Sequence, residues 1–182
     1  LTGAAKTNVQ QITPLHVEPL HLLVKPELAK TISQRGLYAL ESRTINVGTL
    51  GSGTCALSQE FLGFLGLQPD TNSRGPTASS NGHYFSRHQS YDEIIAIEQT
   101  EALSDAVFSI SSLPSPIARH LVQHHDYELI AVPMGEAFAL DAYNDRRLAT
   151  SVTFDKRKVV ETIIPAYTYS VSKSVPPQPL KS

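Results

Sequence analysis

Apolar positions along the chain alternate between short extended runs and stretches with helical spacing. Extended runs of apolar and β-branched residues indicate strands at 15–24, 44–48, 83–88, 105–110 and 128–132. Helical spacing is found at 54–66, from Ser90 to about Leu103, from Pro116 to about His124, and at 135–143, with a weaker, interrupted pattern at 27–40. Because strands and helices alternate, the sequence predicts an α/β fold with three αβα layers around a mainly parallel sheet.

Several residues predict where these elements begin. Pro19 cannot donate a ladder hydrogen bond, so the first extended run is expected to be an edge strand or an interrupted one. Ser90 followed by Glu93 has the spacing of a capping box at a helix start. Pro116 suits the first turn of the next helix, where a missing N–H does no harm.

The chain divides into a central lobe and two flanking segments. Residues 1–11 are polar and are expected to form a lead-in, 12–170 an α/β lobe, and 171–182 a proline-rich flexible tail. Within the lobe, residues 68–82 lack periodicity and are dense in Gly, Pro, Ser and Asn, which predicts a long surface loop.

A glycine-rich loop joins the strand at 44–48 to the helix at 54–66. This loop contains Gly48, Gly51 and Gly53, and either Ser52 or Thr54 can cap the helix. The first N–H groups of a helix lack internal partners and carry the positive end of its dipole, so this is a candidate anion site. The alternative is an ordinary strand-to-helix turn in which the glycines serve the turn alone.

Composition narrows the range of functions. The 182 residues are 41% hydrophobic and 18% charged, as in a globular domain. The net charge of −2 shows no excess of positive charge of the kind that binds nucleic acid. No apolar run has the length of a membrane helix, and residues 1–6 are not the start of a signal peptide. Since the chain begins with Leu1, we expect a processed product or an excised part of a longer protein.

Candidate reactive groups are few. His120, His124 and His125 have metal-ligand spacing, but no carboxylate or cysteine completes a set, and histidine near a helix end also suits the helix dipole. Cys55, the single cysteine, follows the glycine loop, where a helix start favours a thiolate, although packing is the commoner role. Ser52 lacks the nucleophile-elbow pattern, because Leu50 stands at the first glycine position. We therefore expect no catalytic residue, no metal site and no cofactor.

The order of the motifs resembles the second, C-terminal lobe of a TAXI-type TRAP-transporter solute-binding protein. The resemblance covers roughly residues 12–169 and includes the segments PLHLLV at 19–24, INVG and GSGT at 45–54, LSDAVF at 103–108, LPSPI at 113–117, ELIAVP at 128–133 and IPAYTY at 164–169. Tyr167 is a departure from the family pattern, which has glycine at this position, in the last crossing between the lobes.

The resemblance implies a type II periplasmic-binding-protein fold, in which two lobes close on a ligand. It implies a non-catalytic role in transport, an extracytoplasmic location, a first lobe upstream and membrane transporter subunits as partners. It also implies that a small organic anion, such as a carboxylate or an amino acid, binds at Gly51, Ser52, Gly53 and Thr54.

A second segment is expected at the same sheet edge, since ligands of open α/β sheets collect where parallel strands end. It comprises Ser111, Ser112, Leu113 and Pro114, for which a proline-terminated turn is the alternative. Glu136 at a helix start suits the dipole or a ligand amine. The competing function is an interaction or scaffold domain that has lost its ligand and docks a partner, or a second copy as a homodimer, through the exposed lobe face.

Overall fold

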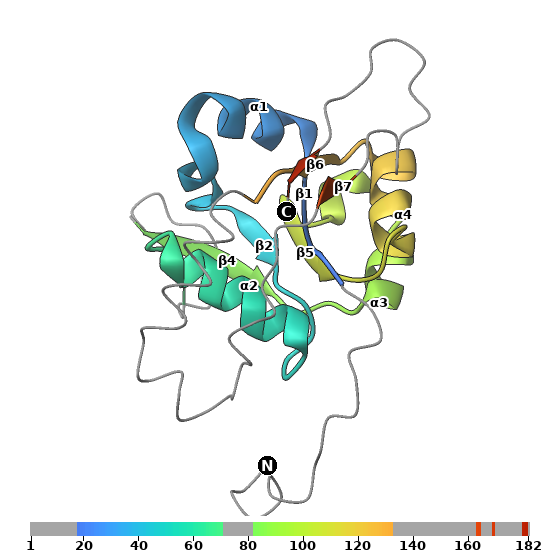
Figure 1. Ribbon diagram of the computed structural model, residues 1–182, viewed down its shortest axis with the longest axis horizontal. Coiled ribbons are helices and arrows are strands. Elements are labelled where there is room, and N and C mark those ends of the chain that lie inside the picture. Colours follow the sequence, from blue (N-terminus) through green and yellow to red (C-terminus); the bar gives the residue numbers. More distant parts are fainter. Residues whose placement is uncertain (1–17, 71–81, 133–162, 165–168, 170–179, 182) are drawn as a thin grey trace, which may run out of the picture.

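A mixed six-stranded sheet forms the centre of the molecule. The structure, a computed structural model, describes residues 18–70, 82–132, 163–164, 169 and 180–181 (Figure 1). The strands lie in the order β3 (Gln68–Pro69), β4 (His83–Arg87), β2 (Thr44–Asn46), β5 (Ala106–Ile110), β1 (Leu20–Val24) and β6 (Glu128–Ile130). Neighbouring strands are parallel from β3 to β5, whereas β1 is antiparallel to both β5 and β6. The predicted α/β class and the mainly parallel sheet are therefore confirmed.

Of the two alternatives expected for Pro19, the edge strand is wrong, whereas the expected interruption agrees with β1, which begins at Leu20, directly after Pro19. β1 lies between β5 and β6 and pairs with β5 along its whole length, from Leu20 to Val24. Pro19 precedes the first paired residue, so its missing N–H removes no ladder bond. Leu22, Leu23 and Val24 are fully buried, as a strand covered on both faces requires.

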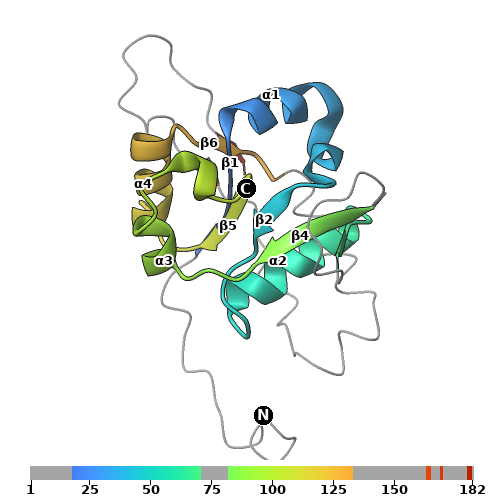
Figure 2. The same cartoon turned by 180° about the vertical axis from the view of Figure 1, so that it is seen from behind.

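Helices cover both faces of the sheet (Figures 1 and 2). α1 (Pro26–Arg35), the 3-10 helix η2 (Gly36–Leu40) and α2 (Gly53–Phe64) pack on one face with Leu22, Val24 and Phe108. On the other face, α4 (Pro116–His125) and α3 (Tyr91–Ile95) pack with Leu23 and Val107. Side chains alternate between faces along β1 and β5, and each face therefore has its own hydrophobic core.

The helix predicted from Ser90 begins as expected and ends early. Ser90 and Glu93 form the predicted capping box, but α3 ends at Ile95, and a 3-10 turn, η3 (Thr100–Ala102), follows. Ile94 and Leu103, which are nine positions apart, are 1% and 3% exposed in the same core. A continuous α-helix with 3.6 residues per turn would place these two side chains on opposite sides of the helix. The helix therefore ends early, and both side chains are buried in the same core.

The helices predicted at 54–66 and from Pro116 agree with the structure. α4 starts at Pro116 behind the N-cap Ser115, whose hydroxyl accepts a hydrogen bond from the Ala118 N–H, and ends at Asp126 in the left-handed conformation. No helix within the described residues is long and apolar enough to cross a membrane. Beyond the six-stranded sheet, β7 (Ile163–Ile164) pairs antiparallel with β8 (Leu180–Lys181).

Some predictions fall on parts of the chain that the structure leaves undescribed. These are the lead-in, most of the loop at 68–82, the helix at 135–143 with Glu136, Tyr167 and most of the proline-rich tail. The division into three segments at 11–12 and 170–171 stays a prediction.

Candidate functional site

The glycine-rich loop, here residues 47–52, follows the central strand β2 at its carboxyl end. Gly48 and Gly51 have φ angles of +88° and +78°, which side chains disfavour. A Cβ atom at Gly48 would lie 3.0 Å from both Cβ and Cγ2 of Thr54. The loop is thus pressed against the first turn of α2, and Gly48 is required there by conformation and by space.

Ser52 is the N-cap of α2, one of the two residues expected in that role. Its hydroxyl accepts a hydrogen bond from the Cys55 N–H at 3.1 Å, and its carbonyl accepts one from the Ala56 N–H. Among the described residues, the N–H groups of Gly53 and Thr54 have no acceptor. Two donors at the positive end of a 12-residue helix therefore remain available for an anion.

The four predicted residues, Gly51 and Ser52 in the loop and Gly53 and Thr54 at the start of α2, differ in exposure. Gly51 and Gly53 are exposed and Ser52 is half-buried, so their backbone can be approached from solvent. Thr54 is buried, with its side chain against Gly48. The Ser52 hydroxyl is occupied by the helix cap, so this segment would contact a ligand mainly through its backbone N–H groups.

A neighbouring loop after β4 holds the glycine-rich loop in place. The Asn46 side chain accepts a hydrogen bond from the Gln89 N–H at 2.8 Å and donates one to the Gln89 carbonyl at 3.3 Å. Nδ1 of His88 lies 3.0 Å from the Gly48 carbonyl. These contacts join residues about 40 positions apart, and the sequence analysis did not find them because no local pattern links the two loops.

The second predicted segment lies at the same edge of the sheet. β5 is parallel to β2 and adjacent to it, so residues 111–114 leave the sheet beside the glycine-rich loop. The Leu113–Pro114 peptide bond is cis. Ser109 donates to the Tyr91 hydroxyl at 2.9 Å and lies 3.3 Å from the Ser111 hydroxyl. The structure thus places the two predicted segments at one edge of the sheet, and no hydrogen bond within the described parts joins 51–54 to 111–114.

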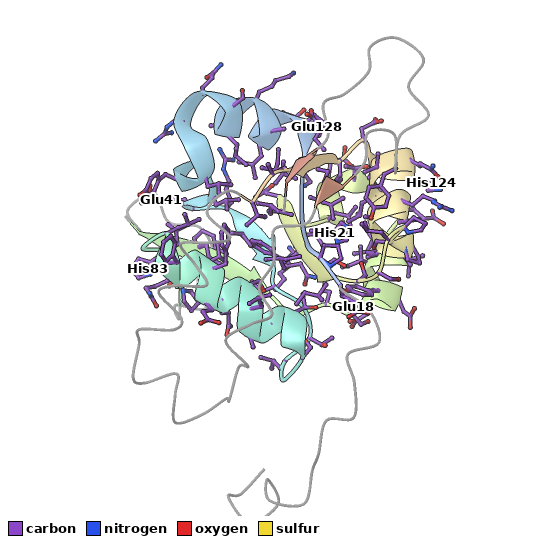
Figure 3. All side chains as sticks on the ribbon, viewed as in Figure 1. Glu18, His21, Glu41, His83, His124 and Glu128 are labelled. Atoms are coloured by element: carbon purple, nitrogen blue, oxygen red, sulfur yellow. The ribbon has the colours of Figure 1, made fainter. Side chains whose placement is uncertain are left out.

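The start of β1 brings His21 to this same edge, since Leu20 pairs with Ile110. Figure 3 labels His21 and Glu18, which lie where the chain enters β1. Nε2 of His21 lies 2.7 Å from the hydroxyl of Tyr169, which also accepts a hydrogen bond from the Ser115 N–H at 3.1 Å. Burial lowers the pKa of His21, opposed by backbone hydrogen bonds with Ser109 and Pro19, so the ring favours its neutral form.

Cys55 lies in the first turn of α2, yet its surroundings do not activate it. The residue is buried, and burial raises the pKa of its thiol despite a hydrogen bond from the Gly51 backbone. His88 Nδ1 is 3.8 Å from the sulfur, but the same nitrogen is 3.0 Å from the Gly48 carbonyl, which can only accept. Nδ1 is therefore the protonated nitrogen of His88 and cannot take a proton from the thiol at that atom.

The histidines of α4 form a close group. The ring of His120 lies 4.9 Å from that of His124 and 5.2 Å from that of His125, measured between ring centres. His125 is buried, and its Nδ1 is 2.9 Å from the Thr100 hydroxyl. Across the described residues, no group of three or more His, Cys, Asp or Glu side chains has an arrangement that could hold a metal ion.

Comparison with known proteins does not assign the chain to a family. No protein-family model and no curated protein matches this sequence.

Proposed function

We propose that this chain is a non-catalytic solute-binding lobe of a TAXI-type TRAP transport system, which takes up a small organic anion outside the cytoplasm. The observation that carries the proposal is a pair of N–H groups at the positive end of α2, those of Gly53 and Thr54, for which the described part of the chain supplies no acceptor. A carboxylate accepting both would form charge-assisted hydrogen bonds of about 1.5–3 kcal/mol each.

The surrounding geometry supports the same function. Exposed glycines at 51 and 53 allow a ligand to approach the backbone, and the contacts of Asn46 and His88 fix the loop before a ligand arrives. The segment 111–114 borders the site from β5, at the edge where ligands of open α/β sheets bind. In this proposal the ligand is held between this lobe and a companion lobe, and the loaded protein delivers it to membrane transporter subunits.

A ligand screen by thermal unfolding tests the proposal. A ligand that binds the folded state raises the unfolding temperature, and the shift grows with the ratio of ligand concentration to Kd. We expect stabilisation by a member of the set that comprises dicarboxylates, acidic amino acids and amide amino acids. The absence of any shift, both in this chain and in a longer form that includes a companion lobe, would contradict the proposal.

Exposed apolar residues favour a second candidate function, an interaction domain. Leu50 is 76% exposed at the tip of the glycine-rich loop. An apolar side chain at that place would suit a protein surface, either a partner or a second copy of the chain. Light scattering after size exclusion separates the two functions: a dimer abolished by Leu50→Ser, and kept by Tyr38→Ser at another exposed apolar position, would favour docking over ligand binding.

A further inference from the structure

A surface hollow lies along α4 and the turn that precedes it. It has a volume of about 290 Å³ and is lined by Pro114, Pro116, Arg119, His120, Gln123 and His124. These six residues are called the α4 hollow below. This volume is just below the range of small-molecule sites, whose volumes begin at about 300 Å³.

The polar groups of the α4 hollow are suited to an anion. Arg119 carries a permanent positive charge, and the rings of His120 and His124 gain a second donor when protonated. The Gln123 amide donates one N–H to the Tyr169 carbonyl at 3.4 Å and has a second N–H for a ligand. No carboxylate is among the lining residues, all of which belong to the described part of the chain. Nothing in the hollow's own lining therefore neutralises the guanidinium.

One atom in this group lacks a partner. Nε2 of His120 is buried and makes no hydrogen bond with any described residue. A buried polar atom without a partner costs free energy, and a rotation of the ring that exposes Nε2 to a hydrogen-bonding ligand in the hollow would recover it. Burial and the neighbouring His125 and His124 also lower the pKa of His120, and a bound anion would offset that mutual repulsion.

We propose that the α4 hollow binds a small phosphorylated ligand, with Arg119 and the rings of His120 and His124 contacting the phosphate. A phosphate monoester matches the fork of a guanidinium, and the volume leaves room for a short organic group against Pro114 and Pro116. A metal ion fits less well, because Arg119 cannot coordinate one and repels it. This site does not depend on the glycine-rich loop, since its residues lie on α4 and the turn that precedes it.

The test is a titration of the full chain with inorganic phosphate and then with glycerol 3-phosphate at constant ionic strength. Histidine ring signals in carbon–proton NMR spectra report the contact. The expected result is a saturable shift of the His120 and His124 signals, with those of His83 and His88 on β4 and the loop after it unchanged. Tighter binding of glycerol 3-phosphate than of phosphate would indicate that the two prolines contact the organic group.

Matched variants separate a specific site from general charge attraction. Arg119 is exposed, so Arg119→Gln leaves the core intact, and it is expected to weaken phosphate binding about tenfold or more. Arg35→Gln, at the end of α1 on the other side of the sheet, is expected to change nothing. No saturable shift, or an equal effect of the two variants, would overturn the proposal.

Two further experiments identify the class of ligand and distinguish this site from the anion site at the start of α2. Zinc binding at His120 and His124 that Arg119→Gln strengthens, together with no response to phosphate, would assign the hollow to a metal and overturn the proposal. Gly53→Leu at the start of α2 is expected to leave phosphate binding unchanged. Loss of phosphate binding in Gly53→Leu would show that the anion binds at α2 and not at the α4 hollow.

Discussion

The hydroxyl of Tyr169 lies 2.7 Å from Nε2 of His21, although 148 residues separate the two along the chain. The Ser115 N–H donates to this hydroxyl, and His21 Nδ1 lies 3.1 Å from the Pro19 carbonyl, which can only accept. Nδ1 is therefore protonated, and the hydroxyl donates its own proton to Nε2. Both nitrogens of a neutral, buried His21 are satisfied, and residue 169 is held against β1 and the start of α4.

Removing the Tyr169 hydroxyl should destabilise the fold. Tyr169→Phe leaves a buried acceptor on His21 and a buried donor on Ser115 without a partner, so we expect a loss of about 1–3 kcal/mol. Unfolding in urea gives the free energy. The matched control is Tyr38→Phe, whose ring is 64% exposed and whose effect should stay within about 0.5 kcal/mol. Equal effects of the two changes would show that the hydroxyl contacts contribute nothing.

The burial of the His21 ring predicts that the stability of the fold depends on pH. Burial lowers the pKa of His21 below its ordinary value of 6.5, so the unfolded chain binds the proton more readily than the folded protein. The contribution of His21 to folding is complete above pH 6.5 and is lost as the pH falls through the lower pKa of the folded state. His120 and His125 have lowered pKa values as well and act in the same direction.

The free energy of unfolding between pH 8 and pH 5 measures this effect. We expect the loss of stability on acidification to be smaller in His21→Gln than in the unchanged protein, because one proton-linked group has been removed. A loss of the same size in both proteins would contradict the assigned role of His21. A ring signal of His21 that titrates at or above its ordinary pKa would contradict it as well.

Two glycines near α2 should respond in opposite directions to alanine. Gly48→Ala places a methyl group 3.0 Å from the Thr54 side chain at a φ of +88°, and we expect a loss of about 1–3 kcal/mol. Gly63, inside α2, would bring a Cβ no closer than 4.0 Å to its nearest neighbour, so Gly63→Ala should stabilise the protein by about 0.5–1 kcal/mol. Urea unfolding checks both, and a neutral Gly48→Ala would show that the loop is not pressed against the helix.

The elements that could be predicted from sequence are those with a local physical signal. Periodicity located α2, α4 and the beginning of α3, helped by the caps Ser52 and Ser90 and by Pro116, because each of these residues acts on the first turn of its own helix. The end of α3 was not predictable in this way. Its cause is the shared burial of Ile94 and Leu103, which depends on the position of the sheet.

Contacts between distant parts of the chain account for the remaining differences between the predicted and the observed structure. The place of β1 inside the sheet follows from its two partners, β5 and β6, and Pro19 alone could not reveal it. For the candidate site, the sequence indicated the segments 51–54 and 111–114, and the structure adds the side chains that position the loop, Asn46 and His88. Polar contacts between distant loops have no periodic signature, so they appear only once the chain has folded.

The central claim is that the start of α2 binds an anion through its backbone. The most direct measurement is an amide NMR titration with the organic anion that stabilises the protein most in the thermal screen, performed on the unchanged chain, on Gly53→Leu and on Gly63→Leu. We expect the largest shifts at the N–H groups of Gly53 and Thr54, and affinity at least about tenfold weaker in Gly53→Leu but unaltered in Gly63→Leu. Binding that leaves these two amides unshifted, or that survives Gly53→Leu, would contradict the account.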